Sequence, residues 1–352
     1  NFCGTINSNF CLNKIVIMGG FCNISELNYI ISKKFEFVVH SWEQVELLES
    51  NKYENLVKSN LNNGVKVWLK LDSGMNRLGF KTHEIISAFE RLSRIEYICD
   101  IKFMTHFACA DKFEKIGSDY IQGHIKGQIN KFDNAFTDLC IIKSNINILR
   151  SAANSGAIIN YSEYLYDIIR PGLLLYGIHK KIDPDRRNKL QNKLQNKLQV
   201  VMTLKARVIA IKKVKQGEGV GYGQRWQASC DTDIAIIGIG YADGYSASAP
   251  DGTPVFLNGK IVRLVGRVSM DSIVVDITAL KTNINNSKSV NVKIGDFAEL
   301  WGDNLSITTI AEFMNCSVYE LMTGVSGRVK RILSVDHDQY INKKKLKAKS
   351  VG

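Results

Sequence analysis

The chain has 352 residues, of which 45% are hydrophobic, and its formal net charge is +12. A chain of this length can bury a large core, and the length favours two domains. It contains no apolar run of about 18 residues and opens with no basic-then-apolar leader, so we expect a cytoplasmic protein with no membrane partner.

The positive charge is concentrated in two segments. Residues 180–199 hold seven Lys or Arg against two Asp, and residues 343–349 hold five Lys. The rest of the chain is close to neutral, whereas a nucleic-acid-binding protein concentrates basic residues on its folded surface. We therefore expect no nucleic-acid partner. The eight cysteines form no Cys-x-x-Cys pair, so we interpret them as free thiols, several of them buried.

Between residues 14 and 178, short β-branched runs alternate with helix-like stretches. This alternation predicts a parallel sheet with crossover helices. Six strands are predicted, whereas a closed barrel of this type needs eight. The predicted strands are Ile15–Met18, Phe35–Val39, Val65–Leu71, Ile101–Phe107, Ile146–Leu149 and Ile168–Ile169.

Residues 181–199 are interpreted as a basic, repetitive insert, because Asn188–Gln199 repeats Asn-Lys-Leu-Gln three times. After this insert, short strands separated by Gly, Asp or Asn predict an all-β domain. Its strands are predicted at Ala206–Ile211, Ile234–Ile239, Val255–Leu257, Ile261–Val265, Ile273–Ile277 and Phe297–Leu300. The predicted segments are an α/β domain (1–180), the insert (181–199), a C-terminal β domain (200–340) and a basic tail (341–352).

Small and polar residues follow the predicted strands of the first half, as in Leu71–Gly74 and Thr105–Ala108. In a (β/α) barrel the chemistry lies at the carboxyl ends of the strands, where these residues fall. Asn154-Ser155 and Arg170–Leu173 follow two successive strands and offer a hydroxyl and backbone N–H groups, which are suited to an anion. No metal site is predicted.

Three further motifs bear on function. Lys70–Phe80 reads Lys-Leu-Asp-Ser-Gly-Met-Asn-Arg-Leu-Gly-Phe, Tyr222 stands between two glycines, and Val265–Asp271 ends in Ser-Met-Asp. With the strand-end clusters, these motifs resemble those of the alanine racemase family over nearly the whole chain. The resemblance implies an incomplete (β/α)8 (TIM-type) barrel that binds pyridoxal 5′-phosphate (PLP), followed by a C-terminal β domain. It further implies interconversion of L- and D-alanine, which supplies D-alanine for peptidoglycan, in a homodimer with shared active sites.

The resemblance also implies roles for individual residues. Arg170 would face the pyridine nitrogen of PLP and keep it unprotonated, because a guanidinium is always charged. Tyr222 would be one catalytic base, and His106 would contact that tyrosine across the dimer interface and relay to Arg170. Arg77 would bind the substrate carboxylate and the cofactor phenolic oxygen, and Lys70 matches a lysine that is often carbamylated. The remaining predicted cofactor contacts are Asn154, Ser155, Gly172 and Leu173, and the remaining substrate contacts are Tyr241, Met270 and Asp271.

The chain departs from the family pattern in two places. The family motif Lys-Ala-(Asn/Asp)-Ala-Tyr-Gly, whose lysine holds PLP and acts as the second base, is absent from the 352 residues. Because family members reach the strand matched by Ile15–Gly19 only after two earlier strands, we expect a racemase that lacks its N-terminal part and is inactive alone. Gly327 stands where some members have a phosphate-contacting tyrosine.

Three alternatives remain open. A broader-specificity amino-acid racemase would share all these motifs. A decarboxylase of the same PLP fold class would place an acidic residue rather than Arg170 at the pyridine nitrogen. A non-catalytic PLP-binding barrel would lack the second domain that Ala206–Arg331 supplies.

Overall fold

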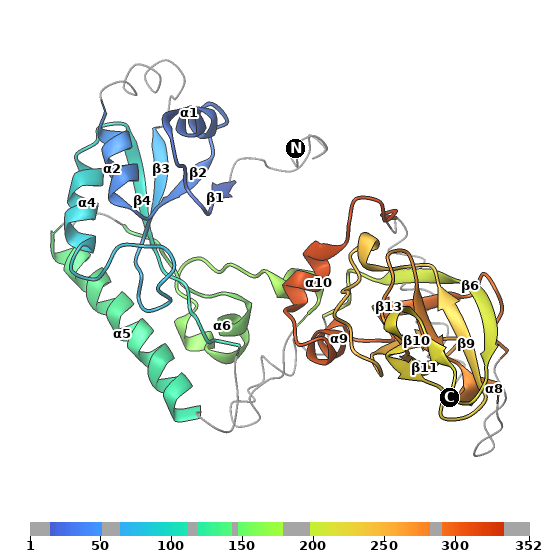
Figure 1. Cartoon of the computed structure of the whole chain (residues 1–352). Helices are drawn as coiled ribbons and strands as arrows, with labels where there is room; N and C mark the ends of the chain where they lie inside the picture. Colours follow the sequence, from blue (N-terminus) through green and yellow to red (C-terminus); the bar gives the residue numbers. More distant parts are fainter. Residues whose placement is uncertain are drawn as a thin grey trace, which may run out of the picture. The chain divides into compact units, whose positions relative to one another are not determined.

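The computed structural model describes residues 15–50, 64–111, 118–142, 147–178, 198–281 and 291–333. The chain divides into two compact units, Asn1–Gln199 and Val200–Gly352, which are described separately (Figure 1). Within the described ranges, none of the helices has the length and apolar character needed to cross a membrane. Residues 181–197 of the predicted insert and the whole predicted basic tail lie outside the described residues.

The first unit contains a five-stranded parallel sheet whose strands lie in chain order, as the alternating pattern predicts. Neighbouring strands are in register through buried apolar residues, with Phe37 opposite Val67 and Leu69 opposite Phe103. Parallel strands in sequential order place all the carboxyl ends on one edge of the sheet. The strands are β1 (Val16–Ile17), β2 (Glu36–Val39), β3 (Val65–Lys70), β4 (Ile98–Met104) and β5 (Arg150–Ser151).

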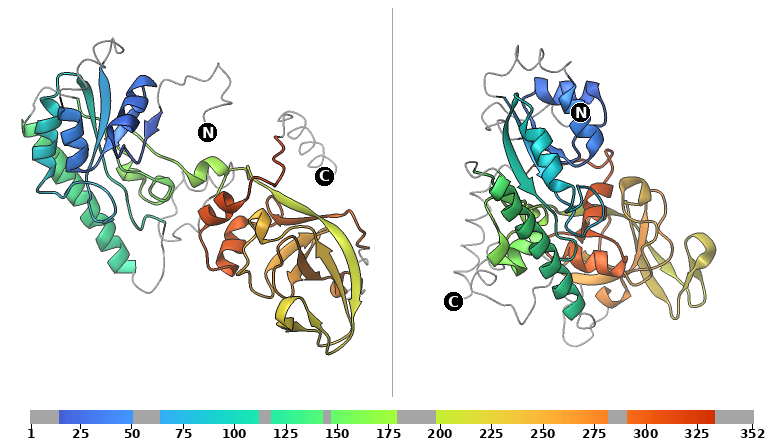
Figure 2. Two further views of the ribbon diagram at one scale, coloured as in Figure 1. Left: turned by 45° about the horizontal axis from the view of Figure 1, so that its top comes forward. Right: turned by 90° about the vertical axis from the view of Figure 1, so that its left-hand side faces the viewer.

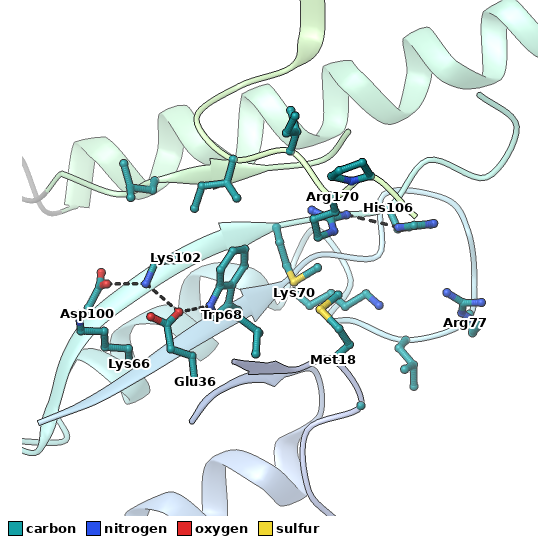
Figure 3. Close-up of a pocket in the computed structure, with 18 of the residues that line it drawn as sticks. Met18, Glu36, Lys66, Trp68, Lys70, Arg77, Asp100, Lys102, His106 and Arg170 are labelled. Atoms are coloured by element: carbon teal, nitrogen blue, oxygen red, sulfur yellow. Dashed lines mark hydrogen bonds and ion pairs between the residues drawn. The ribbon is translucent and has the colours of Figure 1, made fainter. Parts of the chain in front are cut away.

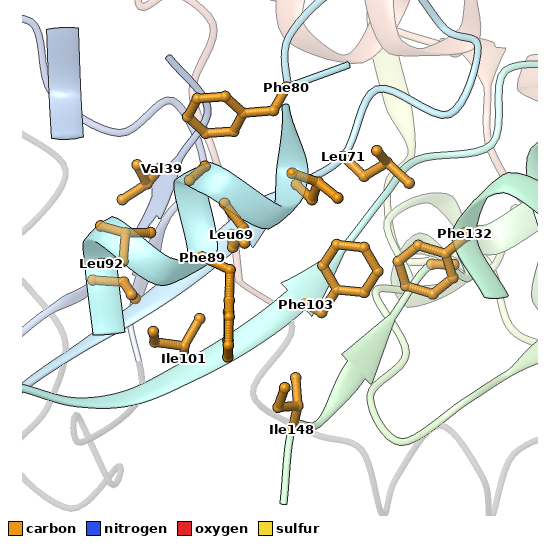
Figure 4. Packing of buried hydrophobic residues seen from close by; sticks show 14 of the residues in the cluster. Val39, Leu69, Leu71, Phe80, Phe89, Leu92, Ile101, Phe103, Phe132 and Ile148 are labelled. Atoms are coloured by element: carbon orange, nitrogen blue, oxygen red, sulfur yellow. The ribbon is translucent and has the colours of Figure 1, made fainter. Parts of the chain in front are cut away.

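Helices cover one face of this sheet (Figure 2). The apolar side chains that point to this face form a continuous core, in which the ring of Phe103 stacks on Phe132 at 4.6 Å between centroids (Figure 4). The helices begin at polar caps such as Asn23, whose side chain accepts a hydrogen bond from Glu26 N. They are α1 (Ile24–Ser32), α2 (Trp42–Glu49), α4 (Ile85–Ser93), α5 (Ser118–Ile142) and α6 (Ser155–Asn160).

Two predicted strands of this unit were wrong in position. The strand predicted at Ile146–Leu149 lies instead at Arg150–Ser151, because the described Ile148 is buried in the core while the backbone of residues 150 and 151 pairs with β4. Ile168–Ile169 is not a regular strand. The chain there runs beside β5, held by single bonds such as Arg170 N to Ala153 O (2.9 Å) and an isolated bridge between Asn154 and Arg170.

The second unit is a closed six-stranded antiparallel barrel in the order β10-β11-β12-β9-β6-β13. All six strands overlap the predicted ones. They are β6 (Leu204–Val214), β9 (Thr232–Ile237), β10 (Pro254–Leu257), β11 (Lys260–Leu264), β12 (Ile273–Asp276) and β13 (Phe297–Trp301). A short hairpin of β7 (Gly219–Val220) and β8 (Trp226–Gln227) adjoins the segment containing Tyr222.

The prediction that this domain is all-β was wrong. It also contains α8 (Thr278–Lys281), α9 (Ile307–Phe313) and α10 (Val318–Gly324). Ser306 and Ser317 cap the last two helices through their hydroxyls, and each helix buries apolar residues against the unit. The expectation of several buried cysteines was also wrong for the six that are described, which are free thiols at exposed or half-buried positions.

Candidate active site

The face of the parallel sheet opposite the helices lines a cavity of about 1280 Å³ (Figure 3). Side chains alternate along a strand, so β3 directs Val67 and Leu69 into the core and Trp68 and Lys70 into the cavity. Four of the predicted site residues line this cavity, all from strand ends: Lys70, Arg77, His106 and Arg170.

Arg77 is presented by a loop that is closed at its base. Asp72 N donates to Phe80 O (2.8 Å), and Phe80 N donates to Lys70 O (2.9 Å). The Asp72 carboxylate accepts Asn76 N (2.9 Å) and pairs with Lys81 (2.6 Å). Gly79 has φ +124°, and a Cβ there would lie 2.6 Å from Asp72 N, so the loop requires glycine at this position.

Arg170 and His106 form the polar centre of the cavity. One guanidinium nitrogen of Arg170 lies 3.3 Å from His106 Nδ1 and donates to Thr105 O (2.6 Å), while the other donates to Ser151 Oγ. The amide nitrogen of Asn154 lies 3.4 Å from His106 Nε2. Both ring nitrogens therefore face donor groups, which favours the neutral imidazole because an imidazolium has only N–H donors to offer.

The pKa values agree with this geometry. Burial, the largest cause, and the positive charges of Arg170, Lys70 and Arg77 together lower the pKa of His106 to about 4. Burial also lowers the pKa of Arg170 to about 10, so the guanidinium remains charged at neutral pH. The site thus holds a fixed cation in contact with an uncharged imidazole.

Lys70 is 6% exposed at the end of β3. Its pKa is lowered by burial and by the charges of Arg77 and Arg170, which outweigh the opposing effect of Asp72. An amine with a lowered pKa beside two guanidinium groups is more nucleophilic than an ordinary lysine, and an added negative charge there would be stabilised.

The predicted anion-binding residues lie at the next two strand ends. Asn154 caps α6 by accepting Ala157 N (3.0 Å), and Ser155 Oγ accepts Gly172 N (2.8 Å) and Leu174 N (3.4 Å). The strand-end loop therefore brings one hydroxyl and the backbone N–H groups of residues 172 and 174 together, which are the kinds of donor that bind phosphate. These donors fit a phosphate group. Leu173 is buried, and with Ser155 it lines a second, small cavity.

The part of the large cavity that lies toward the amino-terminal ends of the strands contains a cluster of charged residues that the sequence patterns do not predict. Lys102 pairs with Glu36 (3.1 Å) and Asp100 (2.6 Å), and the indole of Trp68 donates to Glu36 (2.6 Å). One lysine pairs with two carboxylates, so the three side chains carry a formal net charge of −1. Figure 3 shows it at the far end of the cavity from Arg170 and His106.

The remaining predicted site residues belong to the second unit. Tyr222 is 72% exposed, Met270 is 52% exposed and Tyr241 is 46% exposed. Tyr241 N donates to Ser269 O (3.1 Å), so the loops bearing Tyr241 and Met270 pack together. Asp271 pairs with Arg328 (2.6 Å). The side chains of Tyr222, Tyr241 and Met270 are therefore exposed, while the loops that bear Tyr241 and Met270 are held by a backbone hydrogen bond. Exposed aromatic and apolar side chains on such loops are suited to contact with another molecule.

Ser151 and Gln128 are buried polar residues near the cavity that were not among the predicted site residues. Ser151 binds Arg170 directly, but a serine within a strand gives little signal in a sequence. Gln128 bonds to both strand-end loops of β3 and β4. Its signal is a polar residue within the apolar stripe that Ile125, Ile129 and Phe132 form on α5.

Family models match both halves of the chain. Residues 5–180 match the alanine racemase N-terminal domain, and residues 201–333 match the alanine racemase C-terminal domain. An alanine racemase of Photobacterium profundum is 36% identical over 326 residues, which are 92% of this chain and 81% of that protein. One from Coxiella burnetii is 38% identical over 319 residues, which are 90% of this chain and 79% of that protein.

Solved structures give the same result. The biosynthetic alanine racemase of Pseudomonas aeruginosa superposes with a TM-score of 0.73 at 32% identity, covering 91% of this chain and 79% of that one. The alanine racemase of Acinetobacter baumannii superposes with a TM-score of 0.69 at 33% identity, with the same coverage.

Proposed function

Because the chain belongs to the alanine racemase family of PLP-dependent isomerases, we propose that the cavity of the first unit holds PLP and alanine. The observation that supports this most directly is the contact between the Arg170 guanidinium and His106 Nδ1 (3.3 Å) in a cavity that Lys70 and Arg77 also line. Two guanidinium groups can hold a carboxylate substrate, and a neutral imidazole between them can donate or accept a hydrogen bond beside the reacting atoms.

Each end of the cofactor has a candidate contact. Ser155, Gly172 and Leu173, with Asn154 capping the adjoining helix, would hold the phosphate. Arg170 would face the pyridine nitrogen, and because this guanidinium stays charged it would keep that nitrogen unprotonated. Arg77 would bind the phenolic oxygen and the substrate carboxylate through its planar fork of donors. When bound, PLP supplies the electron sink that acidifies the α-hydrogen of alanine.

We propose that Tyr222 removes the proton from one face of the α-carbon. A phenol is an effective base only where its anion is stabilised, and the neutral His106, backed by Arg170, would hold the phenol oxygen. The exposed Tyr222, Tyr241 and Met270 would reach the cavity from a partner subunit. The active form is therefore a homodimer, which sedimentation at micromolar concentration tests.

Lys70 is proposed to be carbamylated. Its lowered pKa favours reaction with carbon dioxide, and the product would replace a cation by an anion between Arg77 and Arg170. With ¹³C-labelled bicarbonate, the protein should show one carbamate carbonyl resonance that is absent from Lys70→Ala. The same resonance in the Lys70→Ala variant would assign it to another lysine.

The 352 residues contain no match to the lysine motif that holds PLP in the family. We propose that these residues alone attach no PLP covalently and racemise no alanine. Sodium borohydride reduction followed by mass spectrometry should find no bound cofactor, whereas fusion to the lysine-bearing segment of a family member should restore both attachment and racemisation. Racemisation by the 352 residues alone, above that of Tyr222→Phe, would show that another lysine has taken the role.

Among the alternatives, a broader-specificity amino-acid racemase fits the same site residues best. Rates of α-hydrogen exchange by the fused protein on L-alanine, L-serine and larger amino acids distinguish the two. A preference for alanine of tenfold or more, about 1.4 kcal/mol in transition-state binding, supports alanine racemase.

A further inference from the structure

Gln128 is buried in an apolar stripe on α5. It is 1% exposed, and Ile125, Ile129 and Phe132 around it are all buried. A buried amide is unfavourable unless its hydrogen-bonding groups are satisfied, so a glutamine at such a position requires polar partners.

The partners of Gln128 come from two different loops. Its Nε2 donates to His106 O (3.1 Å) and to Ser73 Oγ (3.1 Å), and its Oε1 accepts Ala108 N (3.0 Å). Both N–H donors and the carbonyl are therefore used. The side-chain amide of Gln128 holds the main chain at His106 and Ala108 by hydrogen bonds and links that segment to the loop after β3.

The network continues to Arg170. Ser73 Oγ lies 2.7 Å from Thr105 Oγ1, and Thr105 O accepts the guanidinium of Arg170 (2.6 Å). The same guanidinium nitrogen lies 3.3 Å from His106 Nδ1. The main chain held by Gln128 thus determines where the His106 ring meets Arg170.

We propose that Gln128 is a positioning residue for His106, holding the segment from Thr105 to Ala108 so that the imidazole stays against Arg170. The inference rests on the role of His106 in the proposed function. The inference is tested by the ionisation of His106 and the proposed function by racemisation, so a failure of one can be distinguished from a failure of the other.

The ring can report its own position because cations and donors surround it. Arg170 from the segment after β5, Lys70 from β3 and Arg77 from the following loop face it with positive charge, and Asn154 faces it with an amide nitrogen. If the ring moves away from these groups, it becomes more exposed to solvent and its protonated form is no longer repelled by the three cations. The pKa of His106 then rises toward that of a free histidine.

Gln44 on α2 provides a matched control. It is 3% exposed, its Oε1 accepts His40 N (2.8 Å), and its Nε2 donates to Phe21 O (2.9 Å). It therefore joins the loops after β1 and β2 in the manner that Gln128 joins those after β3 and β4. It makes no contact with His106 among the described residues.

The experiment compares Gln128→Met with Gln44→Met in the full chain. Methionine keeps the length and volume of glutamine and removes the hydrogen bonds. Histidine labelled with ¹³C at Cε1 is titrated by NMR, and the His106 signal is assigned with His106→Asn. We expect Gln128→Met to raise the proton affinity of His106 at least about tenfold, and Gln44→Met to change it less than about twofold.

Either of two results would overturn the proposal. An unchanged His106 titration in folded Gln128→Met would show that Gln128 only stabilises the fold. An equal shift in both variants would show general loosening. If Gln128→Met does not fold, hydrogen exchange of the Ala108 amide is measured in the unmodified chain. This N–H should exchange at least about a hundredfold more slowly than in an unstructured peptide. Exchange at the rate of the unstructured peptide would refute the hydrogen bond from Ala108 N to Gln128 on which the proposal rests.

Discussion

The half-buried imidazole of His106 should make the stability of the first unit depend on pH. Its pKa is about 4 in the folded chain against 6.5 for a free histidine. Between these values the unfolded chain binds a proton that the folded chain does not, so the free energy of unfolding rises with pH across this window. The contribution of His106 to the free energy of unfolding is fully present above about pH 6.5 and is lost as the pH falls toward 4.

The size of the effect follows from the two pKa values. Lowering the pH from about 7.5 to about 4.5 should cost the first unit about 2 to 3 kcal/mol through His106 alone. His106→Asn keeps an oxygen that can accept the Arg170 guanidinium but does not titrate, so the variant should lack this part of the pH dependence. Other titrating groups contribute equally to both proteins and cancel in the comparison.

Urea unfolding followed by tryptophan fluorescence measures the difference. Trp42 and Trp68 report on the first unit, and Trp226 and Trp301 on the second. On acidification, the free energy of unfolding of the first unit should fall by about 2 to 3 kcal/mol more in the parent than in His106→Asn. Equal losses in both proteins would refute the conclusion that His106 is held neutral.

Gly79→Ala should destabilise the first unit by about 3 kcal/mol or more in the same assay, because the new Cβ meets the backbone at Asp72 and the positive φ is strained. Gly217→Ala, also at positive φ (+86°) but with nothing within 4 Å, should cost about 1 kcal/mol; similar losses would discount the contact. In the fused, active protein, Tyr222→Phe should abolish racemisation and spare part of the solvent exchange of the α-hydrogen of D-alanine but not that of L-alanine. Equal loss of both exchanges would remove Tyr222 as the base on the L face. Deleting 181–199, most of which lies outside the described residues, should change stability by less than about 1 kcal/mol, and loss of folding would show the repeat to be structural.

Local patterns predicted most of the regular structure. All six strands of the barrel were found, because each is a short run of β-branched or apolar residues bounded by turn residues, and that pattern is a property of neighbouring residues. The two-residue strands β7 and β8 were missed. Its helices were missed because α9 and α10 are only about two turns long, and such short helices are stabilised by packing rather than by propensity. Ile168–Ile169 was misassigned because a β-branched pair has strand propensity whether or not a neighbour pairs with it.

The sequence by itself determined which residues could meet. Lys70 ends β3, Arg77 and His106 follow β3 and β4, and parallel strands must bring their carboxyl ends to one edge, so the presence of these three residues in one cavity follows from order along the chain. Arg170 follows no strand of this sheet, and its backbone is held beside β5 by an isolated bridge to Asn154. Only the tertiary structure decided what chemistry these residues have. The neutrality of His106 depends on burial and on cations from three other segments, and its position depends on Gln128 from a helix 22 residues away in sequence. Dielectric environment and hydrogen-bond geometry are set by distances between segments remote in the chain, and no local pattern of residues encodes them.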